Sequence, residues 1–600
     1  MGDFCLRSSG KSCVSGLADA SDSRPLSMRC LAHRQLGINW SNIPQTESVK
    51  ATWLCTPECI ADVVAIVKSA ERNQLHIHAF GSKWSFSDCA FDSTPTSPTC
   101  LIDTSKLSGM QQLPAAVQKG GPLNNEYLWY VQCGTTIHDL YTELDKNSQA
   151  IQTMGGASGQ TIAGAVSTGT HGGDFRIPPI ADSALAIHLV GGAGVQYWIE
   201  PTNGITDPNA LHAWLASGAD PSNVDPNNII YNDDIFNSCL VSIGLMGVVY
   251  AFVLQTREPY KLTEYTSADT WQSVASKIPQ ILQNNATRFL QLAVCPYQIG
   301  GTNPCLVTAR GELVTSFAAC GKGDVDGAVA HLAVQLGGQI GKGELLDEFS
   351  NFFSLGLSGL VQGAPAPLID LAAISTVAGI QALNQPMEGV LVALINACLH
   401  KDSWRSVLTS EYPNIMQAEW PPTNCGGDSY KVMDSSRRMK NGVNTDPASV
   451  PEDGWPLLSF EVFFPADPAK STNASWVAYV NEAADTINSA TNTFLPGYIG
   501  IRFMGKTRAI LGMAQWDPTC SVEIAVLAGV NNLRNLMDTL LAISQKYGAL
   551  QHWGQLVNSS IDGKAYPDVG RWHNAYSEMN RRSNLSWFQT DLSRRAGLTP

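Results

Sequence analysis

Apolar residues recur at two kinds of spacing along the chain, and together they predict a mixed protein of helices and strands. Ile60, Val63 and Val67 are spaced as on one face of a helix. The apolar run 75–80 that follows predicts a strand. Short helices and strands alternate in this way to about residue 258, which is typical of an α+β or α/β lobe.

Further elements of this first region follow from the same patterns. Strands are expected at 100–107, 127–134, 183–192 and 195–202, and a helix capped by Thr135 or Thr136 at 135–146. The run 238–258 is expected to be an apolar strand that Gly244 and Gly247 punctuate.

The character of the chain changes after residue 259. Helices are expected at 271–283 and 530–548, and strands at 289–297, 456–466, 498–505 and 520–529. Residues 349–399 hold only two charged side chains, but Pro365, Pro367 and Asp370 interrupt every apolar run before it reaches the length of a membrane span. We therefore expect a buried helical insertion at about 320–400 and no transmembrane segment.

Composition and charge limit which binding partners and which cellular compartment are expected. The formal net charge is −14 and no block of Lys or Arg occurs, which argues against a nucleic-acid partner. The 15 Cys are scattered without a C-x-x-C pair, so mostly reduced thiols are expected. Residues 1–35 have mixed charge and no apolar core of a signal peptide, which predicts a poorly ordered tail and a cytoplasmic protein.

The most unusual segment is residues 154–173, MGGASGQTIAGAVSTGTHGG, which we call the glycine stretch. Seven of its 20 residues are Gly, and most of the others are Ala, Ser or Thr. Such a segment lets the backbone approach a ligand closely and exposes N–H groups and hydroxyls that suit a phosphate or a flat polar ring. A second small-residue turn, residues 81–87 (GSKWSFS, the first loop), follows the strand expected at 75–80.

Residues 500–507 match the pattern G-x-x-x-x-G-K-T of a nucleotide-binding P-loop. A P-loop needs small, flexible residues between a strand and a helix, whereas this segment holds the strand formers Ile, Arg, Phe and Met. We interpret the match as a coincidence; a nucleotide triphosphatase would bind Mg-ATP and would lack a yellow colour.

Five motifs share one order with a known family. They are GSKWS at 81–85, SGQTIAGAVSTGTHGG at 158–173, SIGLMGVV at 242–249, IGIRF at 499–503 and HWGQ at 552–555. In this order the chain resembles the FAD-linked oxidases of the vanillyl-alcohol oxidase type, which have a PCMH-type FAD-binding domain. It is most similar to the branch of aldonolactone and alditol oxidases.

The resemblance implies a two-lobed α+β flavoenzyme. The tail at 1–35 would precede an FAD-binding domain at 36–258, a substrate domain at 259–540 would cover the flavin, and a segment at 541–600 would return to the first domain. Carried over by matching, the flavin contacts would be Gly81, Ser82, Trp84, Ser85, Gly159, Thr161, Gly164, Ser167, Thr168, Thr170, His171, Gly244, Gly247 and Val249.

Three departures from the family pattern matter. Trp84 stands where the family has the histidine that bonds the flavin, which implies non-covalent FAD. Gly500 stands where the family has a catalytic Glu, and Gln555 where it has a Lys. Both changes weaken the case for a sugar lactone or polyol as substrate.

Three residues are candidates for catalysis. Arg502 would supply positive charge near the flavin, with Gly500 leaving a gap beside it for a larger substrate. His552 is the candidate base, unless it only packs or caps. Glu523 lies among apolar residues of a strand and faces either the site or solvent, and His171 is expected to be structural or to contact the flavin.

The sequence therefore predicts an FAD-dependent enzyme that oxidises a CH–OH group of a small organic substrate. The apolar insertion favours an apolar alcohol, and O2 or another electron acceptor would reoxidise the flavin. Two alternatives are a tailoring oxidase of secondary metabolism that forms a C=C or C=N bond, and a flavin-binding protein without turnover.

Overall fold

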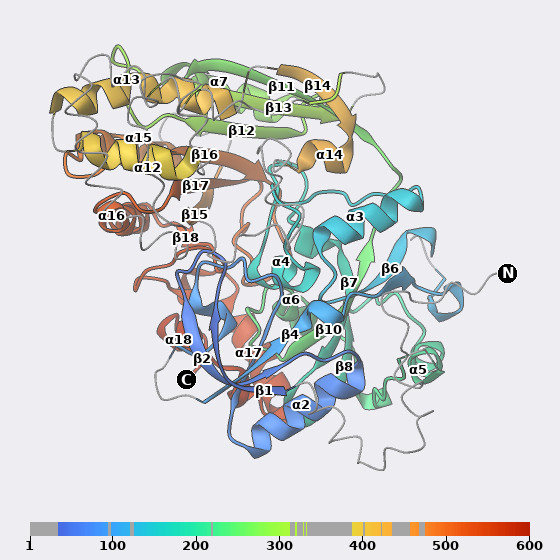
Figure 1. Cartoon of the computed structure of the whole chain (residues 1–600). Coiled ribbons are helices and arrows are strands. Elements are labelled where there is room, and N and C mark those ends of the chain that lie inside the picture. Colours follow the sequence, from blue (N-terminus) through green and yellow to red (C-terminus); the bar gives the residue numbers. More distant parts are fainter. Residues whose placement is uncertain are drawn as a thin grey trace.

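The computed structural model places the chain in two lobes, one above the other, with helices and strands mixed in both (Figure 1). The predicted α+β fold class is confirmed. The structure describes residues 34–93, 98–120, 125–217, 220–312, 318–320, 328, 332, 387–399, 402–419, 421, 423–434, 457–466 and 474–600.

The lower lobe begins with a four-stranded sheet of order β1-β2-β4-β3. Its strands are β1 (Arg34–Ser41), β2 (Ser48–Cys55), β3 (His76–Phe80) and β4 (Thr99–Asp103). Helix α2 (Ile60–Arg72) connects β2 to β3 and buries Ile60, Val63 and Val67, as the apolar spacing predicted. Because β3 ends at Phe80, the first loop starts at the edge of this sheet.

A six-stranded sheet of order β5-β6-β10-β7-β8-β9 forms the rest of the lower lobe. Its strands are β5 (Met110–Gln112), β6 (Leu128–Gln132), β7 (Ala184–Val190), β8 (Gln196–Glu200), β9 (Ile229–Tyr231) and β10 (Val248–Gln255). The helices between them are α3 (Ile137–Lys146), α4 (Ile162–Thr168), α5 (Pro208–Ser217) and α6 (Asp233–Leu240). The prediction of one apolar strand over 238–258 was wrong in its first half. Asn232 caps α6 by accepting from the Ile235 amide, so this segment is helical to Leu240 before β10 begins.

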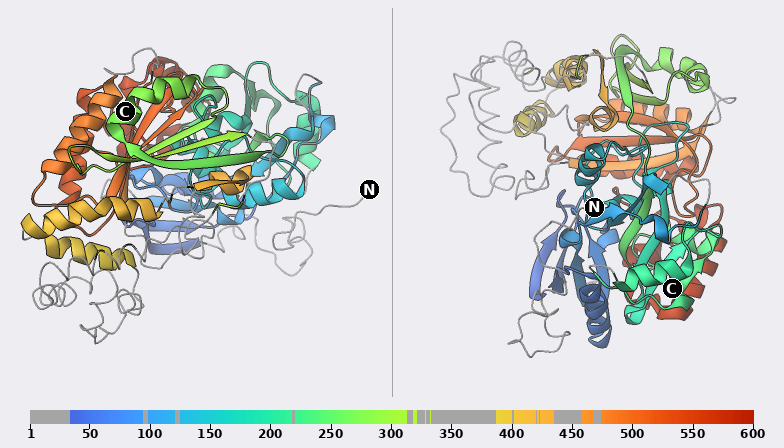
Figure 2. Two further views of the ribbon diagram at one scale, coloured as in Figure 1. Left: turned by 90° about the horizontal axis from the view of Figure 1, so that it is seen from above. Right: turned by 90° about the vertical axis from the view of Figure 1, so that its right-hand side faces the viewer.

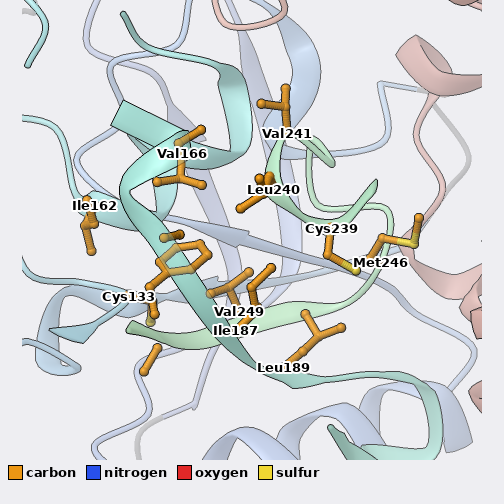
Figure 3. Close-up of a cluster of buried hydrophobic side chains, with 14 of the residues drawn as sticks. Cys133, Ile162, Val166, Ile187, Leu189, Cys239, Leu240, Val241, Met246 and Val249 are labelled. Carbon is orange, nitrogen blue, oxygen red and sulfur yellow. The ribbon is translucent and has the colours of Figure 1, made fainter. Parts of the chain in front are cut away.

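Helix α4, inside the glycine stretch, is held down by its apolar side chains. Ile162 and Val166 are fully buried in a cluster with Leu240 of α6 and Val249 of β10 (Figure 3). Its small residues therefore remain available on the other side of the helix. This packing explains why a segment so poor in large side chains has a defined position.

The upper lobe is built on an eight-stranded sheet of order β14-β11-β13-β12-β16-β17-β15-β18. Its strands are β11 (Lys261–Thr270), β12 (Phe289–Val294), β13 (Pro304–Glu312), β14 (Thr423–Asp428), β15 (Leu457–Pro465), β16 (Gly497–Met504), β17 (Thr519–Leu527) and β18 (Leu550–Gln551). Its helices are α7 (Trp271–Gln283), α12 (Met387–Cys398), α13 (Asp402–Glu419), α14 (Ser429–Met433), α15 (Ser475–Ser489) and α16 (Leu533–Lys546). Helices α15 and α16 pack against β15, so the face of the sheet that they cover is apolar and buried.

The C-terminal segment lies in the lower lobe (Figure 2). Helix α17 (Val569–Ser583) and the short helix α18 (Asp591–Arg595) place Trp572 and Leu592 in the same core as the strands of the lower lobe. The predicted domain boundaries remain predictions, but this return of the chain has the arrangement that they describe.

Most of the predicted insertion at 320–400 lies outside the described residues, apart from α12 and a few neighbours. A search of the described residues finds no helix with the length and apolar character of a membrane span. A disulfide joins Cys320 to Cys425, which differs from the expectation of mostly reduced thiols for these two residues, and nine other described cysteines are free.

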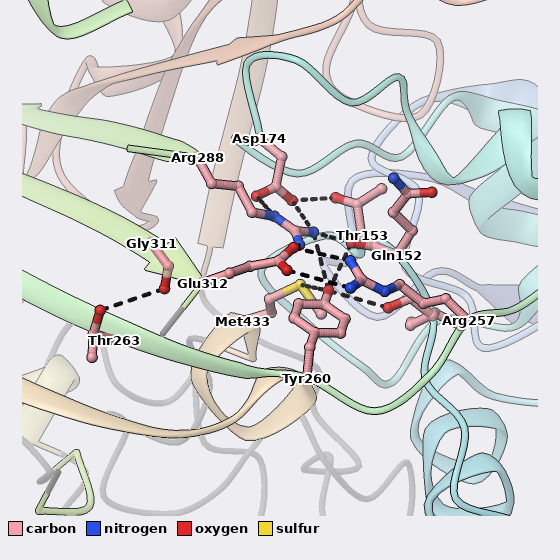
Figure 4. Close-up of polar contacts among 11 residues, drawn as sticks. Gln152, Thr153, Asp174, Arg257, Tyr260, Thr263, Arg288, Gly311, Glu312 and Met433 are labelled. Carbon is pink, nitrogen blue, oxygen red and sulfur yellow. Dashed lines mark hydrogen bonds and ion pairs between the residues drawn. The ribbon is translucent and has the colours of Figure 1, made fainter. Parts of the chain in front are cut away.

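A cluster of charged and aromatic residues joins the two lobes, and we call it the inter-lobe clamp (Figure 4). Arg288, at the start of β12, donates from Nε to Asp174 Oδ1 at 2.7 Å, directly after the glycine stretch. Arg288 also forms an ion pair with Glu312. Glu312 Oε1 forms a second ion pair with Arg257 Nη1 at 2.9 Å. The guanidinium groups of both arginines lie over the ring of Tyr260. The clamp fixes the end of the glycine stretch to the upper sheet.

Candidate active site

A cavity of about 380 Å³ lies between the two lobes. The first loop, the glycine stretch and residues around Gly244 and Gly247 form its lower-lobe walls. Strands β15, β16 and β17, with the segment 552–555, form the upper-lobe wall. Segments far apart in the sequence thus meet in one cavity, whose volume is that of a small-molecule site.

The first loop is anchored to the opposite wall. The Phe86 amide donates to the Gly554 carbonyl at 2.9 Å, and Ser87 Oγ donates to the Trp553 carbonyl at 2.5 Å. Lys83 has a positive φ of 60°, which turns the backbone sharply between Ser82 and Trp84. The loop and the HWGQ segment therefore form one unit.

The glycine stretch is anchored to α3. The Ile137 amide donates to the Gln160 carbonyl at 2.9 Å, and the Ile162 amide donates to the Thr135 carbonyl at 2.8 Å. Thr161 caps α4, since its Oγ1 accepts from the Gly164 amide at 3.3 Å. The two loops touch each other at this cap.

The structure brings nearly all predicted flavin-contact residues to the wall of the cavity. Only Gly159 is not among the lining residues. Those that do line it are Gly81, Ser82, Trp84, Ser85, Thr161, Gly164, Ser167, Thr168, Thr170, His171, Gly244, Gly247 and Val249. The candidates for catalysis, Arg502, His552 and Glu523, line it as well.

Strand alternation presents polar side chains to the cavity and apolar ones to the core. On β16, Tyr498 and Arg502 line the cavity, whereas Ile501 and Phe503 are fully buried in the core of the upper lobe. This alternation was predicted from the sequence. The structure also supports a coincidental P-loop match, because residues 500–504 belong to strand β16 and not to a loop.

Charges of opposite sign alternate along this face. His171 Nε2 lies 3.0 Å from Glu461 Oε2, and the other oxygen of Glu461 lies 3.9 Å from Arg502 Nη1. Arg502 Nη2 donates to Glu523 Oε2 at 2.8 Å. From Glu461 through Arg502 to Glu523 the order is anion, cation, anion, in a site largely removed from water.

The pKa values follow from this arrangement. Burial alone would raise the pKa of Glu461, but its interaction and hydrogen bond with His171 and the charge of Arg502 outweigh it and hold the pKa below its ordinary value. Burial likewise lowers the pKa of Arg502, yet Glu523 and Glu461 outweigh that effect and raise it. Both groups are therefore charged at neutral pH.

His552 is placed differently from a general base. Burial lowers its pKa to about 4, so the ring is neutral near pH 7. Its Nδ1 accepts from the Gly554 amide at 3.0 Å, which puts the single proton of the neutral ring on Nε2. In this state the ring offers a donor rather than a free lone pair, and it caps the turn at Gly554.

The space beside Gly500 is smaller than the sequence suggested. A Cβ at Gly500 would lie 3.2 Å from Cε2 of Tyr498 and 3.7 Å from Cβ of Glu523. Glu523 is the register partner of Gly500 on β17. Tyr498 and Glu523 thus occupy much of the gap that was expected to admit a larger substrate.

Sequence reasoning missed two residues of this wall, Glu461 and Tyr498. Glu461 is a single carboxylate within the apolar strand β15, which is the signal that identified Glu523. Its register partner on β17 is Glu523 itself, so the two carboxylates lie side by side. Tyr498 carried no comparable signal, because aromatic residues are common in strands.

Two unpartnered polar atoms test whether the cavity fits a polar ring that carries N–H donors. Gln160 Oε1 and Gln555 Oε1 are buried and accept no hydrogen bond from any described residue. Both side chains line the cavity, where buried acceptors without partners are costly. A bound group that donates hydrogen bonds would satisfy them, and small residues on both loops leave room for it. The residues present therefore fit FAD.

Gly81 is the position where the two loops have no spare room. A Cβ at Gly81 would lie 2.0 Å from Thr161 Oγ1, and overpacking of this kind costs about 1–3 kcal/mol. We expect Gly81→Ala to weaken FAD binding by roughly 5- to 150-fold, measured by fluorescence titration of the flavin-free protein. Gly120→Ala is the control, because a Cβ at Gly120 meets nothing within 4 Å. Equal affinity in the two variants would contradict this account.

Comparison with protein families gives a match in the lower lobe. Residues 51–200 match the family described as an FAD binding domain. This match lies within the lower lobe and confirms FAD as the predicted cofactor.

Curated relatives match part of the chain. A mitochondrial L-galactono-1,4-lactone dehydrogenase of Brassica oleracea is 23% identical over 247 residues, covering 41% of this chain and 34% of the relative. A D-arabinono-1,4-lactone oxidase of Eremothecium gossypii is 26% identical over 189 residues, covering 31% and 32%. The chain thus matches about a third of the length of these relatives, whose names are those of the branch that the motifs resemble.

Solved structures match almost the whole chain. A solvent-stable cholesterol oxidase superposes with a TM-score of 0.58 at 12% identity, covering 94% of this chain and 98% of the other. A cholesterol oxidase from Brevibacterium sterolicum superposes equally well at 13% identity, covering 94% and 97%. At this identity the likeness establishes the fold of both lobes.

Proposed function

We propose that this protein is an FAD-dependent oxidoreductase that oxidises a CH–OH group of an organic substrate. Bound FAD supplies a hydride acceptor, its N5 atom. The observation that carries the proposal is that the FAD-binding loops and the charged face of the upper sheet line one cavity. The names of the relatives, lactone oxidases and dehydrogenases, support the same class of reaction.

In this proposal the first loop and the glycine stretch hold the cofactor, and the upper sheet supplies the charged groups. Arg502 offers a buried cation for negative charge that develops during oxidation. Glu523 accepts the hydroxyl proton of the substrate, since its Oε1 is bound only by Ser459 at 3.2 Å and Gln555 at 3.5 Å among the described residues. This assignment replaces His552 as the base, because the lone pair on its Nδ1 is already used.

The absorption spectrum of the purified protein is the first test. Visible flavin absorption is expected, and its absence after reconstitution with FAD would refute the proposal. Anaerobic mixing with a panel of aldonolactones, polyols and lipophilic alcohols should then bleach the flavin with at least one class.

The substrate is proposed to be an alcohol of moderate size with an apolar part. The cavity wall supports this, because Leu457, Leu458 and Tyr498 line it beside the charged groups. Fast flavin reduction by lactones or polyols, with none by lipophilic alcohols, would refute this choice and favour the substrates in the names of the relatives. O2 is the proposed acceptor, and H2O2 release during turnover is the measurement.

Two alternatives have distinct outcomes. A tailoring oxidase would reduce its flavin with amines or unsaturated precursors instead of simple alcohols. A flavin-binding protein without turnover would stay yellow with every compound of the panel.

The FAD is expected to be held without a covalent bond. Trp84 lines the cavity at the position where the family histidine carries the flavin link, and an indole offers no comparable nucleophile. Precipitation with acid should leave the yellow colour in the supernatant. Colour that stays with the pellet and survives denaturing electrophoresis would contradict this prediction.

The cytoplasmic location remains a prediction, and one feature argues against it. Disulfides persist mainly in oxidising compartments, and Cys320 and Cys425 form one. Labelling of free thiols in protein from its native source would show whether this pair is oxidised there.

A further inference from the structure

The imidazole ring of His171, in the glycine stretch, faces a hydrogen-bond acceptor at each of its two nitrogens. Its Nδ1 lies 2.8 Å from the carbonyl oxygen of Gly172. Its Nε2 lies 3.0 Å from Oε2 of Glu461. A carbonyl and an ionised carboxylate accept hydrogen bonds and cannot donate them. Both nitrogens must therefore carry a proton, and the ring is an imidazolium.

The environment of Glu461 keeps that carboxylate ionised. The exposed fraction of its side chain is 3%, the same as that of the His171 side chain. Arg502 faces its other oxygen from β16 at 3.9 Å, and Cys520, on the neighbouring strand β17, remains a neutral thiol because burial raises its pKa. A protonated Glu461 donating to a neutral His171 would leave Arg502 beside an uncharged partner, so the ionised pair is favoured.

The other groups around His171 supply no competing charge. The ring of Phe463 on β15 meets the imidazole edge to face, with ring centres 5.1 Å apart. The ring of His552 lies 6.1 Å away and is neutral near pH 7, because burial lowers its pKa to about 4. Asp174, at the end of the stretch, is already paired with Arg288. Glu461 is therefore the group that sets the charge of His171.

We infer that Glu461 is a positioning residue that keeps His171 doubly protonated, so that an imidazolium and the Arg502 guanidinium together present positive charge to the flavin cavity. The part that Glu461 takes in catalysis rests on the proposed function, whereas the double protonation of His171 rests on hydrogen-bond geometry alone. The cation sits on the lower lobe and its carboxylate on the upper sheet, so the pair also holds the two walls of the cavity together. Positive charge placed before the reaction stabilises negative charge that arrives during it.

Glu461→Gln is the decisive variant, because an amide has nearly the shape of a carboxylate but can donate as well as accept. With Gln at this position, His171 keeps Nδ1–H towards Gly172 and can release the proton from Nε2. Its charge then depends on pH over the range where histidines ordinarily titrate, between about pH 5 and about pH 8. In the natural protein the acceptors at 2.8 Å and 3.0 Å place a proton on each ring nitrogen.

The first measurement needs no flavin. Nitrogen-15 labelling of the 11 histidines lets NMR count the protons on each ring, and His171→Gln identifies the signal of His171. Two ring N–H protons on His171 at about pH 8 are expected in the natural protein and one in Glu461→Gln. A single ring proton on His171 in the natural protein would overturn the inference, whether or not the protein binds FAD.

The second measurement uses the FAD-loaded protein. In Glu461→Gln the flavin midpoint potential should exceed that of the natural protein at about pH 5, where the imidazolium has lost its carboxylate partner, and should fall towards it by about pH 8 as the imidazolium loses a proton. In a His171→Gln background, the Glu461→Gln substitution should shift the potential by the same amount at both ends of this pH range, because no imidazole is left to titrate beside it. Glu264→Gln is the matched control, since Glu264 is a buried carboxylate of the same sheet that pairs with Arg310 at 2.8 Å away from the cavity. A potential that responds equally to both Gln variants would overturn the role of Glu461.

Failure of this inference and failure of the proposed function give different results. A protein without bound flavin refutes the function but leaves the count of ring protons intact. A yellow, reducible protein whose His171 carries one proton refutes only the inference.

Discussion

Arg502→Met is expected to slow substrate-dependent reduction of bound FAD by about 10²–10³-fold, the usual cost of removing one preorganised electrostatic group from an active site. Arg502 is a cation with 17% side-chain exposure, and its guanidinium lies between the carboxylates of Glu461 and Glu523. Without it, both anions would face the cavity where negative charge has to be stabilised. Anaerobic stopped-flow measurement of flavin bleaching gives the rate constant directly.

The matched variant is Arg502→Lys, which keeps the positive charge but loses the second donor group. It should recover a large part of the lost rate, because the effect depends on charge. FAD content has to be measured for both variants, so that loss of cofactor is not mistaken for loss of rate. A rate constant for Arg502→Met close to that of the natural protein would show that Arg502 does not take part.

Arg288→Met is expected to lower the free energy of unfolding by about 3–5 kcal/mol, because it leaves a buried carboxylate without its cation. The partner is Asp174, whose side chain is 3% exposed and also accepts from Thr153 Oγ1 at 2.7 Å. Methionine has a similar length, but it removes the charge together with the hydrogen bonds of the guanidinium, such as the one to Tyr260 Oη at 3.0 Å. Denaturant unfolding followed by fluorescence and by flavin release measures the change.

Two further variants separate the buried pair from general damage to the inter-lobe clamp. Adding Asp174→Asn to Arg288→Met should restore much of the stability, since no uncompensated charge remains. Arg257→Met should cost less than about 1 kcal/mol, because its partner Glu312 is 42% exposed. Equal losses in Arg257→Met and Arg288→Met would contradict this explanation of the clamp.

The first loop and the glycine stretch were predictable because each is a run of contiguous small residues. The glycine stretch is visible as small residues at successive positions, and FAD was implied by the resemblance of the five motifs, in their order, to a family of FAD-linked oxidases. Strand β16 was also predictable, since alternation alone separates Arg502 from Ile501 and Phe503.

Interpretations that depended on contacts between strands were less successful. The expected strand over 238–258 begins as helix α6, because Asn232 caps that helix and apolar side chains bury it in either conformation. The gap beside Gly500 is reduced by Tyr498 of the same strand and by Glu523 of the next one. His552 has the residue type of a base, but its hydrogen bond with the Gly554 amide occupies the lone pair that a base needs.

The sequence by itself indicated the fold class through local spacing and the cofactor through the resemblance of its motif order to a family of FAD-linked oxidases. Only the tertiary structure decided how the charges of the site are arranged. Glu461 and Glu523 lie side by side through the register of β15 and β17, and Glu461 reaches His171 across the junction of the two lobes. Register and lobe docking are set by packing over the whole sheet, so no short segment of the sequence contains them.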